Sequence, residues 1–142
     1  MSTPKPTPEA PPARQQILYV SRLVHTCRYE VFAAICRVAR AHNNRAALRG
    51  FLLFDGHRFG QLIEGPAPAA HALMGRIAQD PRHTTLQLLA NHRVPGLSTL
   101  DSWQPGFCAP DELDLFEGPQ GPRGAAAVGA FCALAARADL SP

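Results

Sequence analysis

The sequence has few charged residues and no block of charge of one sign. Charged side chains make up 18% of the 142 residues, and the net charge at pH 7 is +3. Lysine and arginine are scattered along the chain, whereas nucleic-acid-binding proteins gather these residues into a basic patch. We therefore expect no nucleic-acid partner.

Long apolar runs are also missing. No stretch reaches the roughly 18 consecutive apolar residues typical of a membrane-spanning helix. The N-terminal segment MSTPKPTPEAPPARQQ lacks the apolar region of a signal peptide. These absences predict no membrane partner and a cytoplasmic location.

The cysteines and histidines form no metal-binding pattern. Cys27, Cys36, Cys108 and Cys132 are far apart and include no CxxC pair, and the six histidines form neither HxxxH nor HExxH. In a cytoplasmic chain such cysteines are most simply small buried hydrophobic residues. We predict no metal site and no disulfide.

The composition nevertheless predicts one folded domain. Hydrophobic residues form 46% of the chain, and this length allows one ordinary core but not two. Residues 1–13 contain five prolines, which remove backbone donors and prevent helix formation. We expect residues 1–14 to form a disordered extension.

The following segments alternate between strand and helix patterns. Runs of β-branched and aromatic residues predict strands, and apolar residues at helical spacing predict helices. The strands are expected at 16–23, 49–54, 58–64 and 85–93, and the helices at 29–42 and 67–80. Asp55-Gly56 supplies the positive φ angles of a tight hairpin turn between the second and third strands. The order β-α-β-β-α-β predicts a ferredoxin-like α+β fold, with two helices on one face of the sheet.

Two further elements are expected after this unit. TLDSWQPGF, residues 99–107, could add a short edge strand, and RGAAAVGAFCALAARADL, residues 123–140, has high helix propensity. The apolar stripe of this helix consists of Val128, Phe131, Cys132, Leu134 and Ala135. The stripe can pack on the open face of the sheet or against another subunit, and both arrangements remain open.

Polar side chains interrupt the two strands expected at the centre of the sheet. Gln61 shares a strand face with apolar residues, because side chains alternate along a strand. A buried amide costs about 1–3 kcal/mol for each unmade hydrogen bond, so a polar partner is expected. Tyr19, on the neighbouring strand, can be that partner. The simpler alternatives are an exposed glutamine, a core tyrosine, and helix C-cap roles for Asn43 and Asn44.

Taken together, these residues resemble the BLUF domain, a flavin-based blue-light sensor. LYVSR with Tyr19 resembles the first strand of that family, AHNNRAALRGFLLFDGHRFGQLIEGP its helix-1-to-strand-3 segment, and IAQDPRH its exit from helix 2. Trp103, followed by Gly106-Phe107, stands where the family has its C-terminal tryptophan. The resemblance covers residues 17–107. It implies a flavin-binding domain at 15–108, followed by a linker and helix at 109–142.

The resemblance implies a site for FAD, with FMN as an alternative, between the two helices. Asn43 would hold the C4 carbonyl and N3 edge of the flavin. Gln61 would bridge the N5/O4 edge and the hydroxyl of Tyr19. His42 would be a neighbouring contact, and candidates for the ribityl-phosphate side would be Arg45, Arg82 and His83.

The resemblance also implies photochemistry without turnover, so the chain is not expected to be an enzyme. Under blue light Tyr19 would give the flavin an electron and then a proton, and Gln61 would rotate or tautomerise. The altered hydrogen bond would outlast the light, and Trp103 would belong to the output route. The signal would pass to a separate partner protein, and the last helix would cap the sheet or build a homodimer or higher homo-oligomer.

One position departs from the family pattern. Pro105 replaces the methionine that most members carry two residues after the tryptophan, and proline has no backbone N–H. The fifth strand should therefore be shorter or differently paired. This substitution favours an alternative, a BLUF-like interaction module without a flavin photocycle.

A third interpretation is an acylphosphatase-like hydrolase. Its phosphate-binding loop between strand 1 and helix 1 should be glycine-rich, and RLVHTCRYE contains no glycine.

Overall fold

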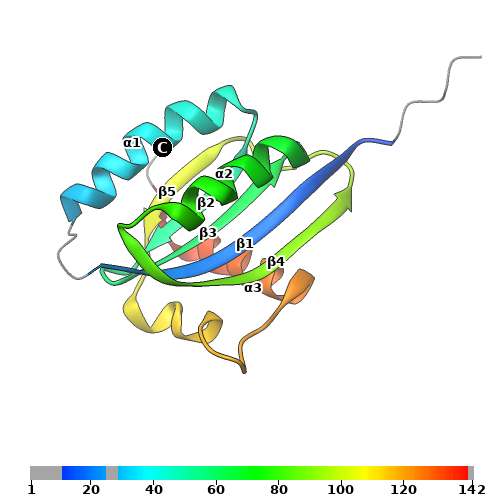
Figure 1. Cartoon of the computed structure of the whole chain (residues 1–142). Helices are drawn as coiled ribbons and strands as arrows, with labels where there is room; N and C mark the ends of the chain where they lie inside the picture. Colours follow the sequence, from blue (N-terminus) through cyan, green and yellow to red (C-terminus); the bar gives the residue numbers. More distant parts are fainter. Residues whose placement is uncertain (1–10, 25–28, 141–142) are drawn as a thin grey trace, which may run out of the picture.

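A six-stranded sheet forms the centre of the computed structural model, which describes residues 11–24 and 29–140 (Figure 1). The strands lie in the order β4-β1-β3-β2-β5-β6. They are β1 (Ala13–Leu23), β2 (Arg49–Phe54), β3 (Arg58–Gly65), β4 (His83–Pro95), β5 (Trp103–Phe107) and β6 (Asp139–Leu140). The helices are α1 (Tyr29–Arg45), α2 (Ala67–Gln79) and α3 (Gly124–Arg137), with short 3-10 turns η1 (Pro110–Glu112) and η2 (Asp114–Phe116). The expected β-α-β-β-α-β order and α+β class are confirmed.

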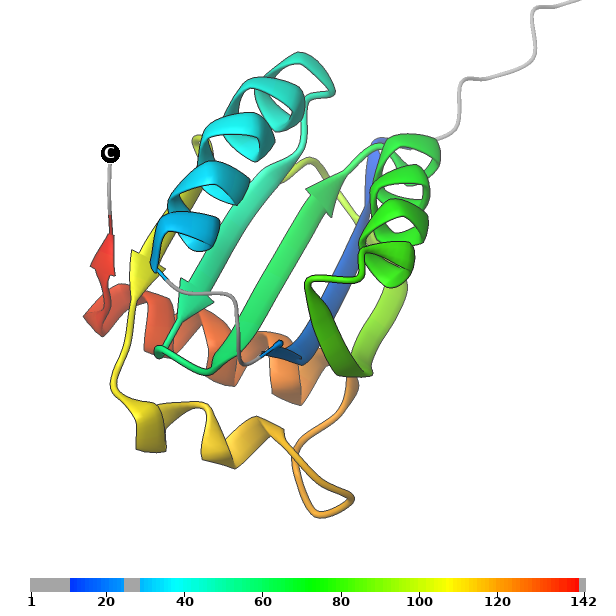
Figure 2. The same cartoon turned by 60° about the vertical axis from the view of Figure 1, so that its left-hand side comes forward.

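The helices cover both faces of the sheet. Figure 2 shows α1 and α2 on one face and α3 on the other. On β1, Ile17 and Tyr19 belong to the core under α2, whereas Leu18 and Val20 belong to the core under α3. The alternation of side chains along the strand therefore supplies two separate cores.

The C-terminal helix packs on the open face of the sheet, which settles one alternative left by the sequence. Four of the five expected stripe residues are buried there, and Cys132 is half-buried against them. Each fully buried aliphatic or phenylalanine side chain contributes about 1.5–3 kcal/mol, so the α3 face is a main source of stability. The buried members are Val128, Phe131, Leu134 and Ala135.

The first strand begins earlier than expected. β1 starts at Ala13, which lies opposite Pro95 of β4, so residues 13 and 14 belong to the sheet and not to an extension. The longer β4 supplies the partners for these two residues, which sequence patterns could not show. Residues 1–10, where the rest of the extension was expected, lie outside the described residues.

Helix α1 ends three residues later than expected, and neither asparagine is its cap. Ala47 takes the left-handed conformation with φ 58°, and the N–H of Leu48 donates to the carbonyl of Asn43 at 2.9 Å. This is the pattern of a Schellman motif, with alanine in the position that glycine usually takes. Asn43 therefore lies within the last turn, where its side chain is free to face the sheet.

The hairpin between β2 and β3 forms at the expected place. Gly56 has φ 100°, and it is the residue of the turn with positive φ. Asp55 stabilises the turn through its side chain, whose Oδ1 accepts from the N–H groups of His57 at 2.8 Å and Arg58 at 2.7 Å. The two residues of the Asp-Gly dipeptide thus have different roles.

The fifth strand accommodates Pro105 without losing its pairing to β2. Gly50 N–H donates to the carbonyl of Ser102, and Cys108 N–H donates to the carbonyl of Phe54. Along a strand, every second residue directs its backbone N–H and C=O groups to the same neighbouring strand. Ser102 and Cys108 bond to β2, so Pro105, which is three residues from each, faces away from β2. The missing N–H of Pro105 therefore removes no bond between β5 and β2. The strand is five residues long, as a short strand was expected, and all five residues are in register with β2. Its last two residues also pair with β6, a strand that the sequence did not reveal.

The described cysteines and histidines form no metal cluster. Within residues 11–24 and 29–140, no three metal-ligating side chains come together, and Cys36, Cys108 and Cys132 are free thiols that are half-buried. Cys27 lies outside the described residues. No helix of the described part has the length and apolar character needed to cross a membrane.

Candidate functional site

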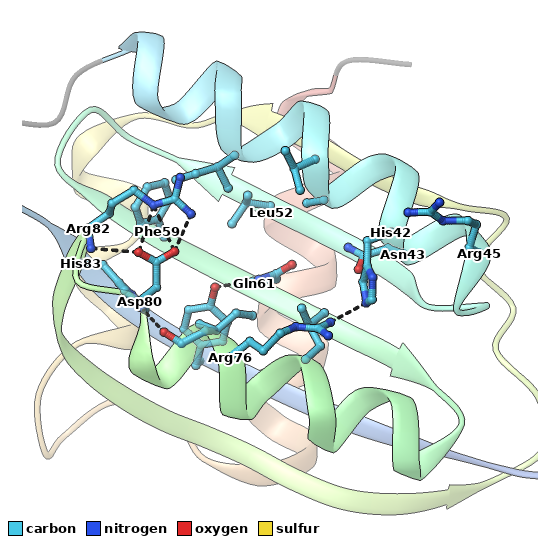
Figure 3. Close-up of a pocket in the computed structure, with 16 residues that line it drawn as sticks. His42, Asn43, Arg45, Leu52, Phe59, Gln61, Arg76, Asp80, Arg82 and His83 are labelled. Atoms are coloured by element: carbon cyan, nitrogen blue, oxygen red, sulfur yellow. Dashed lines mark hydrogen bonds and ion pairs between the residues drawn. The ribbon is translucent and has the colours of Figure 1, made fainter.

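A cavity of about 500 Å³ lies between α1 and α2, above the centre of the sheet (Figure 3). Every residue that the resemblance assigned to flavin binding lines this cavity. They are Tyr19, His42, Asn43, Arg45, Gln61, Arg82 and His83. Six polar or charged residues from three separate segments, and Tyr19 from a fourth, are therefore brought together by the fold.

The floor of the cavity carries a chain of three hydrogen-bonded side chains. Tyr19 and Gln61 are direct cross-strand partners, as expected. The Gln61 Nε2–H donates to the Tyr19 hydroxyl oxygen at 2.6 Å, and the Trp103 Nε1–H donates to Gln61 Oε1 at 2.9 Å. Trp103 is not among the residues that line the cavity, and its side chain is buried in the cluster that contains Leu52 and Phe59.

The chemistry of tryptophan fixes the orientation of this glutamine. An indole N–H is a donor only, so it requires the amide oxygen of Gln61 and turns the amide nitrogen toward Tyr19. The tyrosine oxygen therefore accepts a hydrogen bond, and its own proton remains available for another acceptor. The three side chains form one ordered chain with a defined direction.

Tyr19 is held in its neutral form by its surroundings. The side chain is 4% exposed, and burial raises the pKa of Tyr19 well above its ordinary value. Asp80 acts in the same direction, and the hydrogen bond with Gln61 opposes it. The hydroxyl of Tyr19 therefore keeps its proton.

Asn43 faces the cavity with both polar atoms of its amide unsatisfied. The residue is fully buried, and neither Nδ2 nor Oδ1 has a hydrogen-bond partner among the described residues. Buried polar groups in folded proteins are almost always paired, and each unpaired one costs about 1–3 kcal/mol. The Asn43 amide therefore offers one donor group and one acceptor atom to a ligand in the cavity.

The two ends of the cavity carry different charge arrangements, as Figure 3 shows. At one end Asp80 holds Arg82 through several hydrogen bonds, and this pairing holds the pKa of Asp80 below its usual value. At the other end Arg45 is exposed and has no ion-pair partner among the described residues. The positive charge at the Arg45 end is thus uncompensated.

His42 bridges the two helices near Asn43. Its Nε2 lies 2.5 Å from Nη2 of Arg76 on α2, and the arginine can only donate, so this ring nitrogen accepts. Burial lowers the pKa of His42, and the charges of Arg76 and Arg45 lower it further. The neutral imidazole therefore joins α1 to α2 across the cavity.

His83 lines the cavity, but both of its ring nitrogens are used by the protein. Nε2 donates to the carbonyl of Ile77 on α2, and Nδ1 accepts from the hydroxyl of Ser21 on β1 at 2.8 Å. Its ring lies 6.4 Å from that of Tyr19 in an edge-to-face arrangement. The histidine joins α2 to the sheet beside the tyrosine.

Sequence patterns missed two charged residues of the site, Arg76 and Asp80. Asp80 lies in IAQDPRH, where its position two residues before Arg82 was the available signal. Arg76 gave none, because its partner His42 lies 34 residues away. Apolar residues from both helices and the sheet complete the walls: Ile35, Val38, Ala39, Leu52, Phe59, Leu73 and Ile77.

Comparisons with known proteins agree with this geometry. The family described as "Sensors of blue-light using FAD" matches residues 15–102. Photoactivated adenylate cyclase subunit alpha of Euglena gracilis is 34% identical over 96 residues, which are 68% of this chain and 9% of that protein. The blue light- and temperature-regulated antirepressor BluF of Escherichia coli is 38% identical over 56 residues, 39% of this chain and 14% of that protein. The chain spans about a tenth of the length of the cyclase subunits.

Solved structures share the fold. The dark-state structure of the BLUF protein BlrB has a TM-score of 0.67 at 26% identity, covering 87% of this chain and 96% of that one. Klebsiella pneumoniae BlrP1 with FMN and cyclic diGMP has a TM-score of 0.56 at 24% identity, over 73% and 27% of the two chains. The family match extends over more than half of the chain and includes the whole cavity. This chain belongs to the BLUF family of blue-light sensors.

Proposed function

We propose that this chain is a blue-light photoreceptor that binds FAD in the cavity between α1 and α2. The observation that carries the proposal is Asn43, whose buried amide has no partner for either polar atom among the residues that the structure describes. The flavin ring presents a carbonyl acceptor and an N–H donor side by side at its C4/N3 edge. Its flat apolar body suits the walls of a pocket of this volume.

When bound, the flavin supplies an excited state that oxidises a nearby tyrosine under blue light. Tyr19 is the donor in this proposal, because it is buried, neutral and next to Gln61. Its hydroxyl proton is not used in the bond with Gln61 and would pass to the flavin with the electron, and both would return to Tyr19 as the dark state is restored. No substrate is consumed, so the chain acts as a sensor and not as an enzyme.

In this proposal Gln61 changes between two discrete arrangements, and Trp103 distinguishes them. In the structure its amide oxygen accepts from Trp103 and its nitrogen donates to Tyr19. Reversal of the amide would place a donor against the indole N–H and leave that group unpaired, at a cost of about 1–3 kcal/mol. Light would therefore convert a change at Tyr19 into displacement or loss of the Trp103 hydrogen bond.

The ribityl-phosphate side is assigned to the Arg45 end of the cavity in this proposal. Arg82 is already paired with Asp80, and both nitrogens of His83 are engaged. Arg45 carries an uncompensated charge, and phosphate groups favour such sites. FAD is the proposed cofactor, and FMN would use the same phosphate contact.

The proposed output is a change in contact with a separate partner protein. The photoactivated cyclases that resemble this chain combine light sensing with an effector in one protein, and this chain would reach its effector through binding. Self-association into a homodimer or a higher homo-oligomer is part of the proposal. A cytoplasmic location stays a prediction.

The absorption spectrum of the purified protein, loaded with FAD or with FMN, tests this function. We expect a flavin band that shifts to the red under blue light and returns in the dark. A bound flavin without a shift would contradict the switch. Failure to bind either flavin would favour the interaction module without a photocycle.

The hydrolase interpretation has no support from the described residues. The loop on which an acylphosphatase-like site depends includes residues 25–28, which lie outside the described residues. The polar residues that the fold brings together line the cavity between α1 and α2. All of them lie in the segment that matches the BLUF family.

A further inference from the structure

A second hollow, here called the edge groove, lies on the other side of α1, between this helix and β5. Its volume is about 610 Å³. Most of the residues that line it have apolar side chains: Phe32, Ala33, Cys36, Ala41, Pro105 and Phe107. Phe32 and Pro105 form its buried base. The phenylalanine of β5 is 38% exposed, although its ring lies 5.2 Å from that of Phe32. An exposed aromatic edge of this kind is typical of a surface that another protein covers.

The charged residues that line the edge groove are all basic. Arg37 and Arg40 line it from α1, and none of the described residues that line the groove is acidic. Arg37 is exposed and has no hydrogen-bond or ion-pair partner among the described residues. The groove therefore suits an occupant that carries both carboxylates and an apolar side chain.

The same chain presents such a segment elsewhere on its surface. The acidic loop, residues 110–117 with the sequence PDELDLFE, carries four carboxylates and no basic residue. Leu115 is 60% exposed at the centre of this loop, and Asp111 is exposed without a side-chain partner among the described residues. An apolar side chain flanked by carboxylates complements the apolar and basic residues of the groove.

The acidic loop cannot fill the groove of its own chain. Leu113 and Phe116 anchor the loop in the core on the α3 face, and Arg58 holds it through Asp114 and Glu117. The groove opens beside α1, which covers the opposite face of the sheet (Figure 2). The groove and the loop of one molecule thus stay on different sides of the sheet.

We propose that the edge groove of one chain receives the acidic loop of a second copy of this chain. Leu115 of one copy would lie against the exposed ring of Phe107 of the next, and Asp111 would pair with Arg37. Such a contact joins two different surfaces, so it builds a ring or an open chain of copies and not a symmetric pair. The inference deepens the self-association included in the proposed function, and it names the surfaces involved.

The groove is also connected to the flavin cavity through the protein interior. Phe59 lines the cavity, and its ring lies 4.9 Å from Phe54, which lies 4.7 Å from Phe32 in the groove. Helix α1 supplies residues to both hollows. The groove and the cavity therefore share one helix and one layer of packed aromatic side chains.

Sedimentation velocity of the full chain at increasing concentration tests the proposal. We expect association at about 0.05 M salt and its loss at about 0.5 M, because exposed ion pairs are screened. Arg37→Glu is expected to weaken association at least about fivefold, since it replaces attraction with repulsion. Leu115→Ser should weaken it to a similar extent.

A charge exchange supplies the decisive variant. Arg37→Glu combined with Asp111→Lys restores the pair with reversed polarity, so association should return to within about twofold of the original. The matched control is Arg93→Glu, an exposed arginine on β4 at the other edge of the sheet, which should leave association unchanged. Each variant is checked for unchanged circular dichroism and flavin spectrum.

Three results would overturn the proposal. They are a chain that stays monomeric at every concentration, equal effects of Arg37→Glu and Arg93→Glu, and a double variant that fails to recover. Each is measured in the dark and does not depend on the photocycle. A protein that binds FAD and shifts under light, yet shows one of these results, would refute the groove contact and leave the photoreceptor standing.

Discussion

The two faces of the central sheet are packed in different ways, although the same strands supply both. Under α3 the alternate residues are aliphatic or aromatic and fully buried, as Leu18 and Leu62 show. Under α1 and α2 the neighbouring residues include Tyr19 and Gln61, and a cavity remains between the helices. One face is a closed apolar core, and the other is a partly polar wall prepared for a ligand.

This difference separates the sources of stability from the residues of the switch. Substitutions on the α3 face should affect folding first, whereas substitutions around the cavity should affect flavin binding and the light response first. The following predictions test that separation, beginning with the largest expected change in stability.

Two leucine-to-alanine variants compare the faces directly. Leu134→Ala removes a side chain that is buried on the α3 face, and such changes cost about 2–5 kcal/mol. Leu73→Ala, on the half-buried cavity side of α2, should cost only about 1 kcal/mol in the flavin-free protein. Urea denaturation of both variants measures the free energy of unfolding. Equal losses would contradict the contrast between the faces.

Asn43→Leu should stabilise the flavin-free protein while weakening flavin binding. The substitution removes two buried, unpaired polar atoms, so the free energy of unfolding should rise by about 1–3 kcal/mol. The same change removes the amide proposed to hold the flavin edge. Thermal denaturation and titration of FAD fluorescence measure the two effects.

Asn44→Leu is the matched control for this variant, because Asn44 is exposed on the same turn of α1. It should change neither stability nor flavin affinity appreciably. A loss of stability in Asn43→Leu would show that the asparagine amide is paired within the protein.

Alkaline pH should destabilise the protein through Tyr19. Burial raises the pKa of this tyrosine above its unfolded value, so the folded state keeps a proton that the unfolded state loses above about pH 10. The stabilisation is complete below that pH and decreases by about 1.4 kcal/mol for each pH unit above it. Urea denaturation of the wild type and Tyr19→Phe at several alkaline pH values should show a shallower decrease in the variant. Parallel decreases would place the tyrosine in an exposed site.

Local patterns were sufficient to predict the part of the site that lies on adjacent strands. The strand alternation and the Asp-Gly turn placed Gln61 on the buried face, and the strand order placed Tyr19 beside it. The end of α1 was not predictable, because Ala47 adopts a conformation that alanine rarely favours. The conformational cost of the left-handed backbone at Ala47 is offset by contacts of the surrounding structure, because alanine itself does not favour this conformation.

Features that depend on contacts between distant segments were missed for a common physical reason. β6 has two residues and exists through pairing with Gly106 and Phe107, so it has no pattern of its own. The bond between His42 and Arg76 joins two helices whose relative position is set by the sheet. The apolar stripe of α3 fits a sheet or a subunit equally well, and only the folded chain shows which surface it covers.

The light-induced absorption change of Gln61→Leu tests the central claim most directly, because Gln61 joins Tyr19 to Trp103. The FAD-loaded variant is compared with the wild type and with Gln15→Leu, which alters another buried amide on β1 outside the cavity. The account predicts that Gln61→Leu still binds FAD but shows no red shift under blue light, while Gln15→Leu responds like the wild type. A normal reversible shift in Gln61→Leu would contradict the account and remove the glutamine from the switch.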